Sequence, residues 1–280
     1  MIGAPAYSLD RVLVADLVRD DESREPGYAS VRVATNLGTL VGPPLGALLV
    51  FVAGWTVFLL GIAVLGAVGA AFAIALLPPA HAIVEAREPG SLATVLRDRP
   101  FSLRLVSTLL AFTDYCGFET VLPVIAVSAY GLAPSTWGLL VIISPALVVL
   151  AQLRLTRASS RIPPASRLAG ATLLMGLPFL ALLASSNVAM IAAVIVVFVI
   201  GEMVWMPTSQ AVAAQLAPPH ARGTYFGALA AMTGPAWTLA PFVAFQLRAH
   251  AGVGSVWLLF AAIAVASAAA GAAAVRAAAS

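Results

Sequence analysis

The sequence predicts an all-α polytopic membrane protein, and its composition and the placement of its charges are the observations that predict it. Hydrophobic residues make up 61% of the 280 residues and charged residues only 10%, whereas soluble domains average about 45–50% apolar and about 25% charged residues. A soluble chain of this length cannot hide so much apolar surface, but a lipid bilayer accommodates it. The charged residues cluster between apolar stretches that are long enough to cross a bilayer.

Eight apolar segments reach the length of about 20 residues that a bilayer-spanning helix needs. Charged residues or clusters of Pro and Gly bound each segment. Residues 1–18 contain Asp10, Arg11 and Asp16, so this stretch is too polar and too short to span a bilayer alone. The predicted spanning helices cover residues 33–52, 55–77, 105–128, 136–153, 168–185, 188–214, 225–247 and 256–275.

The distribution of the arginines predicts how these helices are oriented. The chain has 15 arginines and no lysine. Arginines fall in every second connection between the segments, whereas the opposite set of connections contains only Arg248. Cytoplasmic loops are enriched in Lys and Arg, so we expect the Arg-rich side and the C-terminus to face the cytoplasm. The expected location is the cytoplasmic (inner) membrane of a bacterium.

The longest polar connection separates two predicted spanning segments from six. We expect an incomplete N-terminal lobe over residues 1–78, a central cytoplasmic loop over residues 79–104 and a C-terminal six-helix lobe over residues 105–280. A boundary at this connection leaves the two lobes unequal in size.

An internal repeat sets the numbering of the helices. A proline, a charged turn with Arg, a Tyr and a helix broken by Gly and Pro follow one another from Pro5 to Pro44, and again from Pro207 to Pro241, at an offset of about 200 residues. Parallel repeats of six-helix halves build one large class of transporters. The second copy begins in the fourth helix of its half, so residues 1–18 are expected to be the end of a partial helix 4. We therefore expect an N-terminally truncated chain.

Residues 38–46 have the sequence GTLVGPPLG. Glycines at every fourth position of a helix share one face and allow a neighbouring helix to approach closely, and proline removes a backbone donor and bends the helix. The pattern resembles the helix 5 antiporter motif of the major facilitator superfamily (MFS), in its drug/proton antiporter-like branch. The gating residues that the resemblance implies are Gly38, Gly42, Pro43, Pro44 and Gly46.

Two further stretches carry the same resemblance. Residues 201–223 are similar to the turn between helices 10 and 11 of these transporters. The superfamily has a second signature, an Asp/Gly/Arg-rich turn between helices 2 and 3, which is echoed in the second half of the fold. The turn from Arg154 to Arg167 resembles this echo, because it keeps the arginines, but it lacks the acid. The resemblance implies an MFS-type helical bundle with about eight full transmembrane helices, equivalent to helices 5–12, plus the partial helix 4. It implies a secondary active transporter of a small organic solute, with proton-coupled efflux by alternating access of two lobes.

Alternatives to transport stay open, namely a truncated, transport-inactive remnant and a non-transport membrane partner protein. An enzyme is not expected, because no Ser/His/Asp or Cys/His set lies at membrane depth. No cofactor or metal is expected either, because no Cys/His cluster has metal-ligand spacing, and nucleic-acid binding lacks a basic stripe with interleaved aromatic residues. The expected partners are a small-molecule solute, protons and the lipid bilayer.

Three acidic residues fall inside predicted spanning segments, Asp114, Glu119 and Glu202. An ionisable residue at the centre of a membrane helix costs about 2.5–3.5 kcal/mol on insertion scales, so such residues are rare without a role. Glu202 is the first candidate for proton coupling, because helix 10 faces the opposite lobe in this fold. Asp114 and Glu119 lie about 140° apart on a helix, so at least one is expected to face a central cavity. A structural hydrogen bond or interhelical pair is the alternative role for each.

Polar and aromatic side chains at membrane depth complete the candidate site. Aromatic rings can stack on an aromatic or cationic solute, and polar residues can contact solute or bond neighbouring helices. The candidates for contact with solute are Tyr115, Gln210, Asn36, Trp205 and Trp237. The tryptophans at predicted helix ends, which are expected to be interfacial anchors, are Trp55, Trp137 and Trp257.

Overall fold

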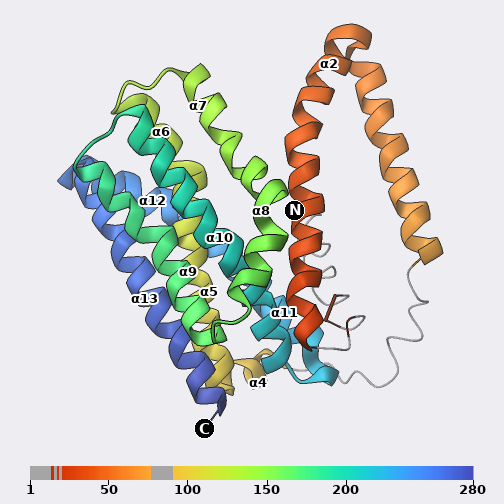
Figure 1. The fold of residues 1–280 in the computed structure, drawn as a ribbon, viewed down its shortest axis with the longest axis vertical. Coiled ribbons are helices and arrows are strands. Elements are labelled where there is room, and N and C mark those ends of the chain that lie inside the picture. Colours follow the sequence, from red (N-terminus) through yellow and green to blue (C-terminus); the bar gives the residue numbers. More distant parts are fainter. Residues whose placement is uncertain (1–13, 16–17, 19–20, 77–90, 280) are drawn as a thin grey trace.

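The computed structural model describes residues 14, 15, 18, 21–76 and 91–279 (Figure 1). Most of the predicted partial helix 4, residues 1–18, and much of the predicted central loop, residues 79–104, therefore lie outside the described residues. The described end of that loop is helical, because it contains α4 (Leu92–Arg97) and the start of the next helix. Ser91 caps the N-terminus of α4 by accepting a hydrogen bond from the Thr94 amide.

The chain enters the membrane region through one long helical element, α2 (Asp21–Leu76), which reverses direction at Gly54. Gly54 has φ 79° and ψ 173°, a region that is accessible almost only to glycine. Figure 1 shows the resulting hairpin, with a first leg beside the rest of the molecule and a second leg apart from it. Side chains of the second leg are accordingly exposed, as at Ile74.

The remaining described chain forms a helical bundle, here called the C-terminal bundle (Arg99–Ala279). Several of its spanning segments are interrupted by a short turn of another helix type or by a kink. Its elements are α5 (Arg99–Cys116), η1 (Gly117–Val121), α6 (Leu122–Ser128), α7 (Pro134–Val141), α8 (Ile143–Ser159), α9 (Pro164–Gly176), η2 (Leu177–Leu183), α10 (Val188–Leu216), η3 (Pro219–Ala221), α11 (Arg222–Ala231), α12 (Thr233–Ala251) and α13 (Val253–Ala279).

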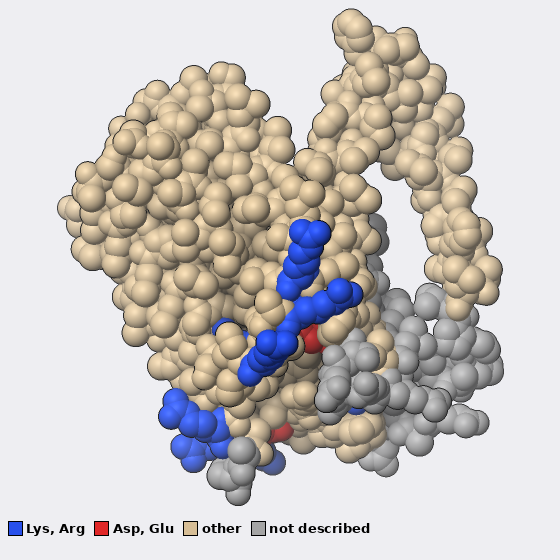
Figure 2. Space-filling model, in the orientation of Figure 1, with Lys and Arg blue, Asp and Glu red and all other residues tan. Residues whose placement is uncertain are grey.

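Seven helices in the described chain are long and apolar enough to cross a membrane. The first of them, Arg24–Leu76, contains both legs of α2, so the seven helices make eight passes. This result confirms the predicted all-helical membrane fold. The C-terminus and α4 lie at the lower end in Figure 1, opposite the tip of the α2 hairpin. On the face drawn in Figure 2, the charged atoms lie at mid-height and below.

Aromatic stacking fills the interior of the C-terminal bundle. The rings of Phe179 and Trp257 stack with centroids 5.4 Å apart, and those of Phe118 and Phe198 with centroids 4.2 Å apart. Trp257 is fully buried and its indole nitrogen donates to the Tyr130 hydroxyl at 2.7 Å. The expectation that Trp257 is an interfacial anchor is therefore wrong, because its ring is 0% exposed and packs against Phe179 inside the bundle instead of facing lipid headgroups.

The glycines of the predicted gating motif do not all have neighbours in the described structure. A Cβ at Gly38 or Gly42 would meet no atom within 4 Å, whereas Gly46 lies against the ring of Phe58 from the second leg. Of these three positions, only Gly46 thus leaves room for a neighbouring side chain, the Phe58 ring, within the hairpin. The two prolines of the motif face a different feature, the cavity described below.

Alanine at Gly54 is expected to disturb the turn between the two legs of α2. The backbone there is essentially restricted to glycine and costs about 1–3 kcal/mol for other residues. Spin labels at the exposed positions Leu48 and Leu60 report the spacing of the legs by dipolar spectroscopy. We expect Gly54→Ala to lengthen or broaden this distance. Gly66→Ala, where a Cβ meets nothing within 4 Å, should leave the distance unchanged.

Candidate functional site: a cavity between α2 and the C-terminal bundle

A cavity of about 1030 Å³ lies between the first leg of α2 and helices α5–η1, α7–α8 and α10. Along α2 it extends from Tyr28 to Pro44, which corresponds to about 24 Å of helix. Its size exceeds the common range of small-ligand pockets, about 300–1,000 Å³, only slightly. The residues that line it are Val14, Tyr28, Val31, Arg32, Thr35, Asn36, Thr39, Leu40, Pro43, Pro44, Tyr115, Phe118, Glu119, Val141, Ile142, Ser144, Pro145, Glu202, Met206, Pro207 and Gln210.

The polar side chains of α2 follow one face of the first leg, because residues three and four apart on a helix are neighbours. Thr35 donates to the Val31 carbonyl, Asn36 to the Arg32 carbonyl and Thr39 to the Thr35 carbonyl. These bonds satisfy side-chain donors within the helix and leave the side-chain oxygens able to accept from a solute. Asn36 is one of the two polar amides that the sequence singled out, and Gln210 also lines the cavity.

An ion pair joins the two walls of the cavity. The Arg32 guanidinium donates to the Glu202 carboxylate at 2.6 Å, and the two side chains are only 11% and 5% exposed. The partners are 170 residues apart in the chain. Within the described residues, the second Glu202 oxygen and the Arg32 Nε have no hydrogen-bond partner. Glu202 is therefore held by a specific charge rather than facing lipid.

The two other acidic candidates have different environments. Glu119 lies in the π-helical turn η1, is exposed and lines the cavity, as does Tyr115 one helical turn before it. Asp114 is completely buried beside Gly176, and neither carboxyl oxygen has a hydrogen-bond partner in the described structure. Of the three acids, Glu202 and Glu119 thus reach the cavity, whereas Asp114 points into the C-terminal bundle.

Neither of the two tryptophans proposed for solute contact is among the residues lining the cavity. Trp205 is buried behind its wall, where its ring meets Phe112 edge-on with centroids 5.2 Å apart. Trp237 is 45% exposed on α12 and packs edge-on against Tyr115 with centroids 6.2 Å apart. From α10 the cavity is lined by Glu202, Met206, Pro207 and Gln210, whereas Trp205 lies at the flank of this face and is 1% exposed. Tyr115 itself lines the cavity.

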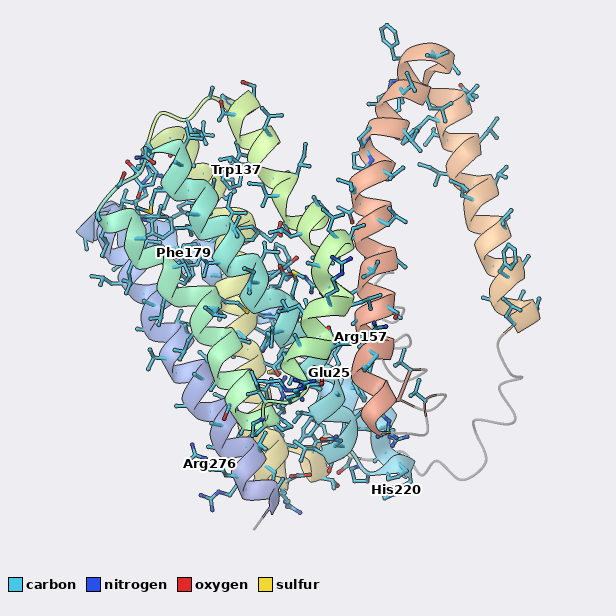
Figure 3. The ribbon with its side chains drawn as sticks, in the orientation of Figure 1. Glu25, Trp137, Arg157, Phe179, His220 and Arg276 are labelled. Atoms are coloured by element: carbon cyan, nitrogen blue, oxygen red, sulfur yellow. The ribbon has the colours of Figure 1, made fainter. Side chains whose placement is uncertain are left out.

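A second ion pair joins α2 to the C-terminal bundle one helical turn beyond Tyr28. The Glu25 carboxylate of α2 accepts hydrogen bonds from two helices of the bundle. Arg167 of α9 donates to its two oxygens at 2.5 and 2.6 Å, and the Thr208 hydroxyl of α10 donates to one of them at 2.8 Å. Figure 3 shows Glu25 at the lower end of α2, toward the C-terminal bundle. Sequence reasoning missed this contact. The sequence offered a partial signal, since the turn ending at Arg167 contains arginines but no acid, and the structure pairs Arg167 with an acid of another helix, Glu25.

Removing the Glu25 charge is expected to loosen this end of the cavity. Arg167 is 8% exposed, and a buried charge that loses its partner is strongly destabilising. We expect Glu25→Gln to increase the rate at which a thiol reagent reaches Gln210→Cys from the Arg167 end in oriented vesicles. Thr208→Val removes one hydrogen bond worth about 1 kcal/mol and should have a smaller effect. Equal labelling rates in all three proteins would show that this contact does not close the cavity.

A cavity with charged side chains in a mainly apolar lining, walled by spanning helices from two parts of one chain, is the arrangement of helical membrane transporters. The sequence profile of the Major Facilitator Superfamily matches residues 1–241, and the chain belongs to this superfamily. Its members are transporters rather than enzymes.

A solved structure extends the comparison to the fold. The fold is similar to the crystal structure of the human organic anion transporter MFSD10 (TETRAN), with a TM-score of 0.72 and 20% sequence identity. The similarity covers 94% of this chain and 67% of that one. At this level of identity the likeness shows the fold alone. No curated protein matches the chain by sequence.

Proposed function

We propose that the chain acts as an MFS-type secondary active transporter that exports a small organic solute in exchange for protons. The observation that carries this proposal is the cavity between α2 and the C-terminal bundle, whose described lining includes three formally charged side chains, Arg32, Glu119 and Glu202. Ionisable groups in a membrane interior mark ion or substrate pathways. A cavity between two helical groups is the setting that alternating access requires.

The division of the chain suits alternating access. We assign residues 1–78 to an N-terminal lobe, residues 79–104 to a central cytoplasmic loop and residues 105–280 to a C-terminal lobe, with the two legs of α2 as helices 5 and 6 of the superfamily fold. The ion pair between Glu25 and Arg167 crosses between these lobes at the Arg-rich end. In this proposal this end and the C-terminus face the cytoplasm of a bacterial inner membrane, so the ion pair acts as a contact between the lobes on the cytoplasmic side.

The pair of Arg32 and Glu202 is the proposed link between protons and movement. Protonation of Glu202 removes the charge that holds Arg32 at 2.6 Å, so α2 can separate from α10. Loss of the proton restores the pair and favours the closed arrangement. Pro43 and Pro44 line the cavity on the same leg, and prolines that bend a helix suit a gate. These features support placement in the drug/proton antiporter-like branch.

Transport by the purified chain in proteoliposomes tests the proposal. Vesicles containing a pH-sensitive dye are given an outward or inward proton gradient and exposed to a panel of organic cations, anions and neutral sugars. Solute movement should depend on the gradient, and Glu202→Gln should uncouple it from protons. A chain that moves none of these solutes would contradict transport and favour the inactive remnant or the membrane partner protein.

A further inference from the structure

We propose that three arginines at one end of α8 form a binding site for the headgroup of an anionic phospholipid. The residues are Arg154, Arg157 and Arg161, here called the α8 arginine row. None of them lines the cavity, so the site is separate from the one described above. The inference does not depend on whether the chain transports a solute, because it concerns the lipid that surrounds the chain.

The α8 arginine row follows one face of the helix into the turn after it. Its members are three and four positions apart, a spacing that places side chains on the same side of a helix, and all three are exposed. Figure 2 shows basic side chains that follow one another downward from mid-height, and Figure 3 labels the middle arginine, Arg157. The opposite face of α8 is buried, and its Gln152 donates to the Met203 carbonyl of α10 at 2.8 Å. This packing directs the row outward.

The row begins inside the part of α8 that spans the membrane. The span runs from Pro134 to Ser159, so Arg154 lies about 7.5 Å of helix before its end. Leu150, one turn further into the span, is 73% exposed, and in a membrane such an apolar surface is covered by lipid chains. Arg154 therefore lies near the boundary between hydrocarbon and headgroups, where a long basic side chain extends toward the headgroups.

The guanidinium groups of the row have no counter-charge within the described chain. The ion pairs between described residues are made by two other arginines, Arg32 and Arg167. Figure 3 labels an acid toward the same end of the molecule, Glu25, but it is the partner of Arg167. None of the three guanidinium groups donates a hydrogen bond to another described residue either. Three positive charges at the edge of the membrane are thus available to an external anion.

A phosphate diester is the group that suits this row. Arginine presents a planar fork of N–H donors that binds phosphate oxygens through two parallel bonds. Each basic residue next to a membrane surface strengthens attachment to anionic lipid about fivefold. Phosphatidylglycerol and phosphatidylcholine both carry this phosphate, but the choline group of the second adds a positive charge. Because the row offers no carboxylate to that charge, we expect the anionic lipid to be preferred.

The plainer alternative is that these arginines are solvated at a helix end and form no site. Basic side chains interact favourably with the C-terminus of a helix, and loops on one side of a membrane protein are enriched in arginine. In that case every exposed arginine on the Arg-rich side attracts anionic lipid to the same extent. Three other exposed arginines of this side provide the comparison, Arg97, Arg99 and Arg276.

Lipid titration of the purified full chain in detergent, followed by native mass spectrometry, tests the inference. The dissociation constant of the first bound lipid is compared for phosphatidylglycerol and phosphatidylcholine with the same acyl chains. We expect the parent chain to bind phosphatidylglycerol about tenfold or more tightly. The triple variant Arg154→Gln, Arg157→Gln and Arg161→Gln should lose this preference. Arg157→Gln alone, the milder change, should reduce it about threefold to fivefold.

The matched control removes the same number of charges elsewhere. The triple variant Arg97→Gln, Arg99→Gln and Arg276→Gln should keep the preference, and the melting temperature in the same detergent checks that both triple variants fold.

The outcomes that overturn the inference are distinct. An equal loss of preference in the two triple variants would show that only total charge counts. Equal affinity of the parent chain for the two lipids would show that the row does not select a headgroup. Displacement of phosphatidylglycerol by inorganic phosphate at constant ionic strength would assign the row to a soluble anion instead of a lipid. A lipid preference that depends on the row, in a chain that moves no solute, supports the inference and contradicts the proposed function alone.

Discussion

Replacing Arg32 by methionine is expected to destabilise the packing of α2 on the C-terminal bundle by about 3–5 kcal/mol, the range found when a buried ion pair loses one partner. Glu202 is 5% exposed and its second oxygen already lacks a hydrogen-bond partner among the described residues. Without Arg32 the carboxylate must stay charged and unpaired, take up a proton, or draw water into the interface. Each of these responses weakens the contact between the first leg and α10.

A second substitution distinguishes the charge from the packing. The double variant Arg32→Met and Glu202→Met removes both charges and keeps similar volumes, so we expect it to recover most of the loss, because replacing a buried pair by apolar residues is often neutral. The measurement is the melting temperature in one detergent, together with disulfide cross-linking between α2 and α8. A single variant as stable as the parent would show that water, not Arg32, stabilises Glu202.

Local properties of the chain account for what sequence reasoning predicted correctly. The eight passes follow from runs of apolar residues, since a bilayer imposes the same length on each helix whatever its neighbours. The reversal at Gly54 and the break near Gly117 coincide with glycines visible in the sequence. The superfamily assignment likewise depends on local motifs. These features need no knowledge of which helices touch.

The candidate site was only partly predictable, because contacts between distant helices decide it. The pairing of Arg32 with Glu202 joins residues 170 positions apart, and α2 had no acid or base in its predicted span to suggest it, since Arg32 immediately precedes residues 33–52. Which of Asp114 and Glu119 faces the cavity depends on the extra residue of the π-helical turn, which changes the helical phase. Trp205 resembled a cavity residue only because its depth, but not its direction, can be inferred from sequence.

Alanine at Gly176 is expected to cause the largest loss of stability within the C-terminal bundle. A Cβ there would collide with Cβ of Ala264 and lie 2.8 Å from the Phe260 carbonyl oxygen, both on α13. Neither atom is the end of a flexible side chain, so α9 and α13 must move apart. Overpacking of this kind costs about 1–3 kcal/mol and occasionally more. Separation of these helices would also open the environment of Asp114, whose carboxyl lies beside Gly176.

The same helix provides the matched control. Gly170 of α9 is exposed and a Cβ there meets no atom within 4 Å, so Gly170→Ala should raise stability by up to about 1 kcal/mol through helix propensity alone. Melting temperatures of the two alanine variants in one detergent compare the same substitution with and without a neighbour. Equal values would mean that α9 and α13 slide past each other at little cost. A clear loss at Gly176 alone would mean that α9 and α13 are packed too tightly to separate easily, which favours movement of α2 against the C-terminal bundle in the alternating access proposed above.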